Sequence, residues 1–137
     1  MGIFQDLCGA ILTECAANFF TSRSDNGTST GFTHTSNSGW TNYDRSGTST
    51  SYTIKDYHGG WTNYDRYGAS TGFARKDHDG WTFYDRYGAS TGYAKKDHSG
   101  YTIYSRDGAT TGYLRKDTSG KLVEYDSYGR RIGFVED

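Results

Sequence analysis

The sequence predicts an all-β protein: an antiparallel β-hairpin repeat array, folded as a twisted single-layer meander, behind one N-terminal α-helix. Three observations predict it. Residues 60–79 and 80–99 differ at only four of twenty positions, turn motifs recur along the chain, and strand-length segments rich in Ser, Thr and aromatic residues separate them. Repeats of this length are typical of arrays whose units must stack to bury their apolar faces. A β-solenoid, in which each long segment breaks at its glycine, is the alternative fold.

The turn motif is Asp-x-x-Gly or Ser-x-x-Gly. Asp or Ser suits the first position of a type I turn and Gly suits the fourth. In a hairpin that glycine takes a positive φ and closes a G1 bulge. Successive motifs alternate between 12 and 8 or 9 residues apart. We therefore expect eleven turns, beginning at Ser24, Ser36, Asp44, Asp56, Asp65, Asp77, Asp85, Asp97, Ser105, Asp117 and Asp126.

The chain divides into an N-terminal amphipathic helix with its linker, residues 1–23, and tandem hairpins over residues 24–137. Apolar residues within 3–20 form one broad helical stripe, and the polar residues 21–27 follow as a link. We expect the helix to pack on its own sheet. Pairing between protomers, and a position on a membrane surface or a role in export, are the alternatives.

The N-terminal segment also bears on location and redox state. It lacks a basic n-region and carries Asp6 and Glu14, so it does not fit a secretory signal. It is too short and interrupted for a membrane span, and the cytoplasm is the expected location. Cys8 and Cys15 lie two helical turns apart, about 10 Å, too far for a disulfide between them. We expect buried thiols in a reducing compartment; an inter-subunit disulfide and a lipidated cysteine are the alternatives.

Strands follow from residue 28 onward. Segments of eight residues, such as ASTGFARK, alternate with segments of four or five, such as WTFY, and both compositions favour strands. Each long segment except one carries glycine at its fourth position, where a bulge or bend would let it exceed its short partner. These glycines are Gly31, Gly72, Gly92, Gly112 and Gly133, with Ser51 as the exception.

Aromatic residues take the place of a conventional aliphatic core. The chain has only eleven Ile, Leu and Val residues, so its stability must come from ladder hydrogen bonds and cross-strand aromatic pairs, each about 0.2–1 kcal/mol. Period-2 alternation places aromatic residues on both faces of the sheet. They form three stripes: Trp40, Trp61, Trp81 and Tyr101; Tyr43, Tyr64, Tyr84, Tyr104 and Tyr125; and Phe32, Tyr52, Phe73, Tyr93, Tyr113 and Phe134.

The expected sheet is too wide for its helix. Twelve strands spaced ~4.8 Å apart span about 55 Å, whereas an eighteen-residue helix reaches about 27 Å. The rest of the sheet must therefore curl, pair with another molecule or remain exposed.

The repeats resemble a known family. Tyr64-Asp65, Tyr84-Asp85 and Tyr125-Asp126, each followed by x-x-Gly, are similar to the YD repeats of Rhs-type bacterial proteins. The unit GWTNYDRYGASTG resembles, more closely in length, the YD-like tandem arrays of about twenty residues in uncharacterised bacterial proteins. The likeness covers residues 28–137 and implies hairpin repeats. Long Rhs arrays enclose a toxin, but this chain has too few repeats for a shell.

Composition and motifs narrow the function. A formal net charge of −1 gives no argument for nucleic-acid or membrane binding. The chain has no single-copy Ser-His-Asp or Cys-His set, so we expect no enzymatic activity. No Cys/His cluster has metal-ligand spacing, and no cofactor is predicted. The turn histidines beside aspartates do not match a calcium β-roll repeat.

The predicted functional surface is aromatic and basic. Arginine recurs at the second turn position, which folding does not require, and a row of such side chains could hold phosphate, carboxylate or sulfated groups. We expect a structural or interaction protein whose partner is a protein or a second copy joined through the N-terminal helix. A carbohydrate or cell-wall ligand module is the alternative. The candidate residues are Arg45, Arg66, Tyr67, Arg86, Tyr87, Arg106, Trp40, Trp61 and Trp81.

Overall fold

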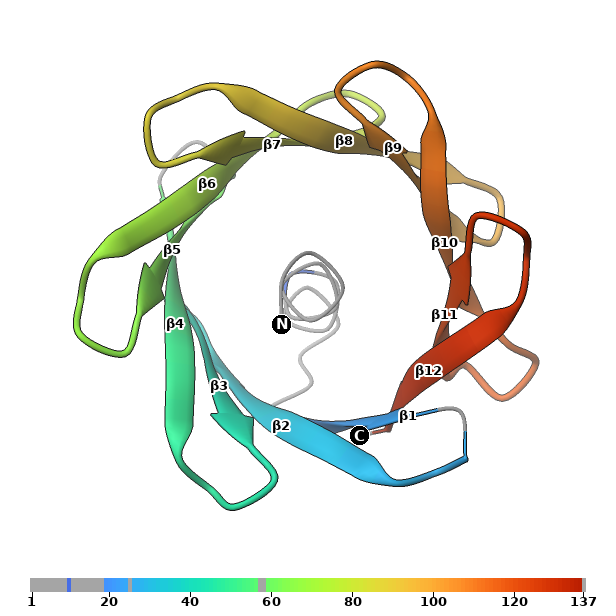
Figure 1. The fold of residues 1–137 in the computed structure, drawn as a ribbon, viewed down its shortest axis with the longest axis horizontal. Coiled ribbons are helices and arrows are strands. Elements are labelled where there is room, and N and C mark those ends of the chain that lie inside the picture. Colours follow the sequence, from blue (N-terminus) through green and yellow to red (C-terminus); the bar gives the residue numbers. More distant parts are fainter. Residues whose placement is uncertain (1–9, 11–18, 25, 57–58, 137) are drawn as a thin grey trace.

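The computed structural model describes residues 10, 19–24, 26–56 and 59–136. Its twelve strands form one closed antiparallel barrel in which each strand pairs with its sequence neighbours and β12 pairs with β1 (Figure 1). The predicted all-β antiparallel meander is confirmed. The strands are β1 Phe19–Ser24, β2 Ser29–Ser36, β3 Gly39–Asp44, β4 Ser49–Lys55, β5 Trp61–Asp65, β6 Ser70–Lys76, β7 Gly80–Asp85, β8 Ser90–Asp97, β9 Gly100–Ser105, β10 Thr110–Lys116, β11 Leu122–Asp126 and β12 Arg131–Glu136.

Closure of the sheet corrects the predicted single layer. β1 occupies residues assigned from sequence to the end of the helix and the polar link. It pairs with β2 on one side and with β12 on the other, where Thr21 lies opposite Glu136 and Ser24 opposite Gly133. The sheet therefore curls until its two edge strands satisfy each other's backbone groups. The solenoid alternative is wrong, because consecutive strands run antiparallel throughout.

The helix predicted for residues 3–20 lies outside the described residues, apart from Ala10 and the start of β1. Ala10 is only 4% exposed and belongs to the same buried cluster as Trp61 and Leu114. The chain ahead of β1 thus contributes at least this residue to the core. The described part of the chain has no helix long and apolar enough to cross a membrane.

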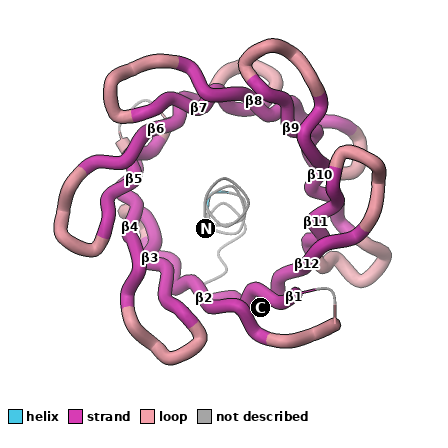
Figure 2. Tube along the Cα trace, viewed as in Figure 1, coloured by secondary structure: helices cyan, strands magenta, loops and turns pink. Residues whose placement is uncertain are grey.

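Six turns lie at one end of the barrel, after β1, β3, β5, β7, β9 and β11 (Figure 2). In the β7–β8 turn, the Gly88 amide donates to the Asp85 carbonyl at 3.1 Å and the Asp85 amide donates to the Ala89 carbonyl at 2.9 Å. Gly88 has φ +89°, and the β7–β8 register shifts next to the turn. A register shift accompanies each of the six turns. The predicted G1 bulge is confirmed at this end.

The opposite end uses glycine differently. Gly100 lies inside β9, directly opposite Asp97 of β8, and closes no bulge. A Cβ atom on Gly100 would stand 1.9 Å from the carbonyl oxygen of Leu114 on the next strand. Gly39 and Gly80 have the same close contact with their neighbouring strands. The bulge prediction is therefore wrong at these three turns, because the glycine is needed for the close approach of two strands.

Alternation along the strands separates an inner from an outer wall. Trp61 lies opposite Ala74, and Trp81 lies opposite Ala94; all four are at most 4% exposed and belong to one buried cluster. The neighbouring residues on each strand face outward. The tryptophan stripe thus lines the inside, while the tyrosine and phenylalanine stripes form the outer surface.

Replacing each kind of glycine by alanine tests these two roles. Gly100→Ala should cost about 2–4 kcal/mol of unfolding free energy, because the new methyl group collides with backbone. Gly88→Ala should cost about 1–2 kcal/mol, since no atom lies within 4 Å of the added Cβ and only the left-handed φ is unfavourable. Urea denaturation measures both. Equal costs would contradict the close-approach role of Gly100.

Candidate functional site

The three tryptophans predicted for a ligand surface lie in the core. Trp40, Trp61 and Trp81 are 3%, 2% and 4% exposed, and their rings contact one another, with centroids 5.4 Å apart for Trp40–Trp61 and 4.4 Å for Trp61–Trp81. The prediction is wrong because alternation alone does not say which face of a sheet becomes the inside. These side chains stabilise the barrel rather than meet a partner.

The outer wall carries stacked aromatic pairs that recur with the repeat. Tyr93 and Tyr104 are a typical pair, with ring centroids 4.8 Å apart and planes inclined by 20°. Lys95 lies 5.9 Å above the Tyr93 ring. Phe32–Tyr43, Tyr52–Tyr64 and Phe73–Tyr84 stack with the same geometry. Each ring covers one face of its partner, so these pairs hold strands together and offer little open aromatic surface.

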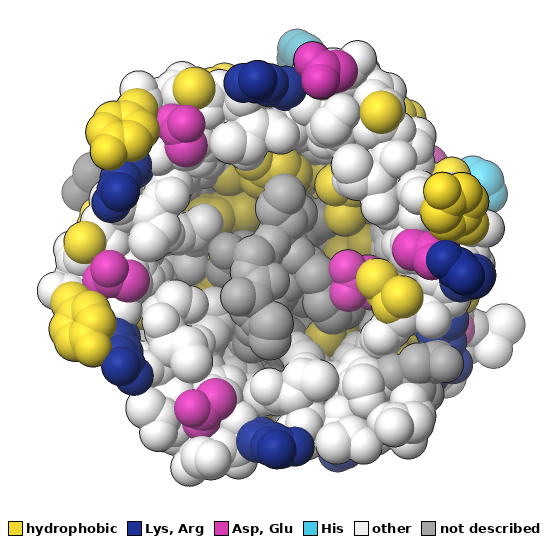
Figure 3. All heavy atoms as spheres, viewed as in Figure 1, with side chains coloured by type: hydrophobic (Ala, Val, Ile, Leu, Met, Phe, Trp, Pro, Cys, Tyr) yellow, Lys and Arg dark blue, Asp and Glu magenta, His cyan; other side chains and the backbone are white. Residues whose placement is uncertain are grey.

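The predicted arginines meet at one end of the barrel, on a surface that we call the crown. The crown consists of the six turns after β1, β3, β5, β7, β9 and β11. Basic, acidic and hydrophobic side chains alternate around its rim (Figure 3). Arg45, Arg66, Arg86 and Arg106 are all exposed there. Within the described ranges none of these four arginines forms an ion pair with a carboxylate.

Two crown turns carry the same exposed pair. The Arg66 guanidinium lies 5.1 Å from the centre of the Tyr67 ring, and the Arg86 guanidinium lies 5.3 Å from that of Tyr87. Tyr67 is 80% exposed and Tyr87 is 83% exposed. Because β5–β6 and β7–β8 are neighbouring hairpins, the two pairs stand two strands apart, about 10 Å. The structure thus places two exposed arginine–tyrosine pairs next to each other on the crown.

The turn aspartates fix these side chains in place. Asp85 Oδ1 accepts hydrogen bonds from the amides of Tyr87 at 2.9 Å and Ala89 at 3.0 Å. Asp65 accepts the same two bonds in its own turn. In the β11–β12 turn, the Arg130 amide and further hydrogen bonds lower the pKa of the equivalent Asp126. The Asp65 and Asp85 carboxylates thus accept hydrogen bonds from the turn backbone, while the arginines of the same turns are exposed.

One crown pair was missed from sequence. Arg130 lies 5.4 Å over the ring of Tyr128, which is 83% exposed. The arginine follows the turn glycine instead of preceding the tyrosine, so it falls outside the column that singled out Arg66 and Arg86. Tyrosine at the third turn position was the signal that could have found it.

The inner wall holds one titratable group of interest, Glu124. It lies opposite Leu114, which is fully buried, and on its other side opposite Gly133. Burial raises the pKa of Glu124 to about 6. Elsewhere on this wall the indole nitrogens of Trp61 and Trp81 are buried without a hydrogen-bond partner among the described residues. The inner wall thus holds a carboxyl group with a raised pKa and two indole N–H groups without a described partner.

In the part of the chain that the structure describes, no group of three or more His, Cys, Asp or Glu residues could hold a metal ion. No protein-family model, curated protein or solved structure matches this chain.

Removing a turn aspartate should loosen the crown. Asp85→Ala leaves the Tyr87 and Ala89 amides without their acceptor, and we expect a loss of about 1 kcal/mol in unfolding free energy. Asp107 has no such bonds in its turn, so Asp107→Ala removes the same charge as a control and should change stability by less than about 0.5 kcal/mol. Chemical denaturation checks both, and equal losses would mean that charge rather than capping matters.

Glu124 should make stability fall as pH rises. Its pKa is raised to about 6 from 4.5, so the folded state binds more protons than the unfolded state between these values. Stability is therefore fully present below pH 4.5 and decreases as pH rises through 6, by about 2 kcal/mol in total. Glu124→Gln should be more stable than the parent at pH 7.5 and equal to it at pH 4. Denaturation at the two pH values measures this, and a pH-independent difference would contradict the burial of the carboxylate.

Proposed function

We propose that this protein is a non-enzymatic interaction module that holds an acidic segment of a partner protein on the crown. The observation that carries the proposal is the repeated Arg–Tyr pair on two adjacent turns, Arg66–Tyr67 and Arg86–Tyr87. Tyrosine and arginine are the residue types enriched at the energetic centres of protein interfaces. Here both are exposed on a rigid rim.

The geometry of each pair suits a carboxylate. A guanidinium that stacks on an aromatic ring has one face covered, while its N–H groups still point outward around its edge. Those N–H groups can donate two parallel hydrogen bonds to a carboxylate. The stacking also limits the side-chain motion that arginine must lose on binding, so Tyr67 and Tyr87 serve as supports as well as contacts.

The spacing of the pairs suits an extended peptide. Neighbouring crown turns are about 10 Å apart, and a peptide in the extended polyproline II conformation advances about 3.1 Å per residue with three residues per turn, so every third side chain lies on one face. Acidic side chains three residues apart on the partner would therefore reach Arg66 and Arg86 together. A chain with the same charges at a different spacing would reach only one of them at a time.

Local charge supports an acidic partner although the whole chain has a formal net charge of −1. The carboxylates of Asp65 and Asp85 accept hydrogen bonds from backbone amides at 2.9–3.0 Å. Their charge is thus directed at the turn backbone, whereas the arginines of the same turns face outward. A partner that approaches the rim meets the guanidinium groups first.

A labelled peptide of Glu-Gly-Gly repeats tests the proposal by fluorescence anisotropy, with Gln-Gly-Gly repeats as the uncharged peptide. We expect only the acidic peptide to bind, and Arg66→Gln/Arg86→Gln to weaken binding about tenfold, or about 1.4 kcal/mol. Both arginines are exposed, so the variant should keep the parent's melting temperature.

A matched double variant removes two charges elsewhere. Arg75 and Lys95 lie on the outer wall over Phe73 and Tyr93, and Arg75→Gln/Lys95→Gln should change affinity less than twofold. An equal loss in both double variants would show that general charge attraction, and not the crown, binds the peptide.

A further inference from the structure

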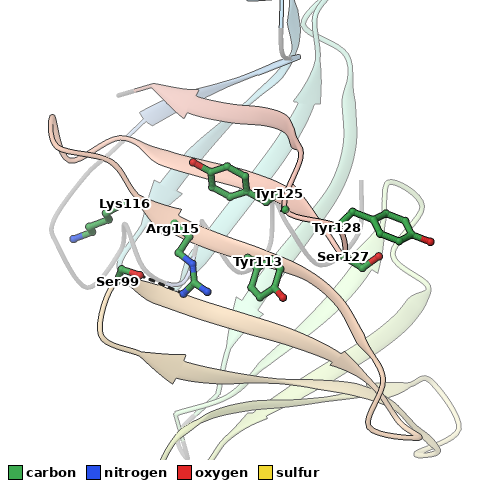
Figure 4. Close-up of a pocket in the computed structure, with 8 residues that line it drawn as sticks. Ser99, Tyr113, Arg115, Lys116, Tyr125, Ser127 and Tyr128 are labelled. Carbon is green, nitrogen blue, oxygen red and sulfur yellow. Dashed lines mark hydrogen bonds between the residues drawn. The ribbon is translucent and has the colours of Figure 1, made fainter.

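A second surface, separate from the two Arg–Tyr turns, carries a different chemistry. An open groove of about 500 Å³ crosses the outer faces of β10 and β11, from the β8–β9 turn to the β11–β12 turn (Figure 4). A volume of this size is typical of small-molecule sites. Its lining includes Ser99, Tyr113, Arg115, Lys116, Tyr125 and Tyr128.

The groove exists because one aromatic pair does not stack. Tyr113 and Tyr125 are cross-strand partners in the register, at the position where four other pairs stack with centroids 4.8–5.1 Å apart. Among the described residues neither ring stacks on another, and Figure 4 shows the two rings lying apart. Tyr113 is covered by Arg115, 4.9 Å from its ring centre. The half-buried ring of Tyr125 lines the groove and has no such cover from a described ring or cation.

Arg115 is held in place by groups at the edge of the groove. Its guanidinium forms an ion pair with Asp97 and donates a hydrogen bond to Ser99 Oγ at 3.3 Å. Burial alone would raise the pKa of Asp97, but hydrogen bonds from Arg115, Ser99 and Thr102 outweigh it and lower this pKa to about 2. The Asp97 carboxylate therefore remains charged and neutralises Arg115, which is fixed over Tyr113.

Lys116 is left as the cation that can meet a ligand. Lys116 is exposed and is one of the lining residues, at the end of β10, and it has no carboxylate partner within residues 19–24, 26–56 and 59–136. Among the described residues that line the groove none is acidic. Hydroxyl groups are abundant there, from Ser99, Ser127 and the tyrosines. One aromatic ring without a stacked partner among the described residues, one cation and several hydroxyls thus line a single groove.

We propose that this groove binds an acidic saccharide. The apolar face of one sugar ring lies on Tyr125, and the carboxylate of another sugar unit meets the Lys116 ammonium group, which lies three residues, or about 10 Å, farther along the strands. The sugar hydroxyls bond with the serine and tyrosine hydroxyls. An apolar ligand would leave these hydroxyls unpaired at a cost, and a neutral sugar would leave Lys116 unused. The acidic saccharide is the class of ligand that uses all three features.

Isothermal titration calorimetry with trigalacturonic acid tests the proposal, and its methyl ester serves as the uncharged probe. We expect the acid to bind at least tenfold more tightly than the ester. Tyr125→Ala and Lys116→Gln should each weaken binding of the acid at least tenfold. Lys116→Gln should also bind acid and ester equally, which a merely structural effect would not produce.

The repeat provides matched controls. Tyr104→Ala removes the corresponding tyrosine from a stacked pair, and Lys96→Gln removes the lysine at the corresponding place on β8; each should leave binding within twofold of the parent. Arg66→Gln/Arg86→Gln should bind the acid normally, which separates this groove from the crown. The proposal is overturned if the acid does not bind at millimolar concentration, if it binds no better than the ester, or if Tyr104→Ala weakens it as much as Tyr125→Ala.

Discussion

The pairing of β1 with β12 is the contact on which the rest of the structure depends. It joins Thr21 to Glu136 and Ser24 to Gly133, at the two ends of the described chain. Without it the sheet would have two open edges, whose unpaired backbone groups invite association with other strands. With it the sheet has an inside, where Trp61 is almost fully buried, and an outside, where tyrosines pair. The crown is a closed ring of turns for the same reason.

A repeated sequence on a closed barrel places each residue type at one height and on one wall. Asp65 and Asp85 accept equivalent backbone hydrogen bonds in neighbouring turns. Tyr67 and Tyr87 occupy equivalent positions in those turns. Regularity of this kind makes the crown a surface with repeated chemistry. It also makes exceptions to the repeat easy to see. Where a residue makes different contacts from its counterparts in other repeats, the repeated fold alone does not explain the difference.

The Tyr113–Tyr125 pair is the clearest such departure. Its residues occupy the register positions of the stacked pairs, yet their rings lie apart and both line a groove on the outer wall. The ion pair of Arg115 with Asp97 holds one side of this groove. The crown thus arises because the same turn is repeated around the barrel. The groove arises because one aromatic pair does not stack as the equivalent pairs do.

The features that the sequence determined by itself are those set by interactions between residues close together in the chain. The turn positions, the strands after residue 28, the glycines beside the bulges and the outward arginines follow from interactions that span at most about four residues, as in the hydrogen bond from the Ala89 amide to Asp85. The sequence therefore located Arg66, Tyr67, Arg86 and Tyr87 on turns. Tertiary structure decided the rest, because β1 finds one of its two partner strands, β12, more than a hundred residues away along the chain. Closure of the barrel also placed the tryptophan face of the sheet on the inside. The groove depends on the relative positions of the Tyr113 and Tyr125 rings, which the spacing of residues in the sequence does not predict.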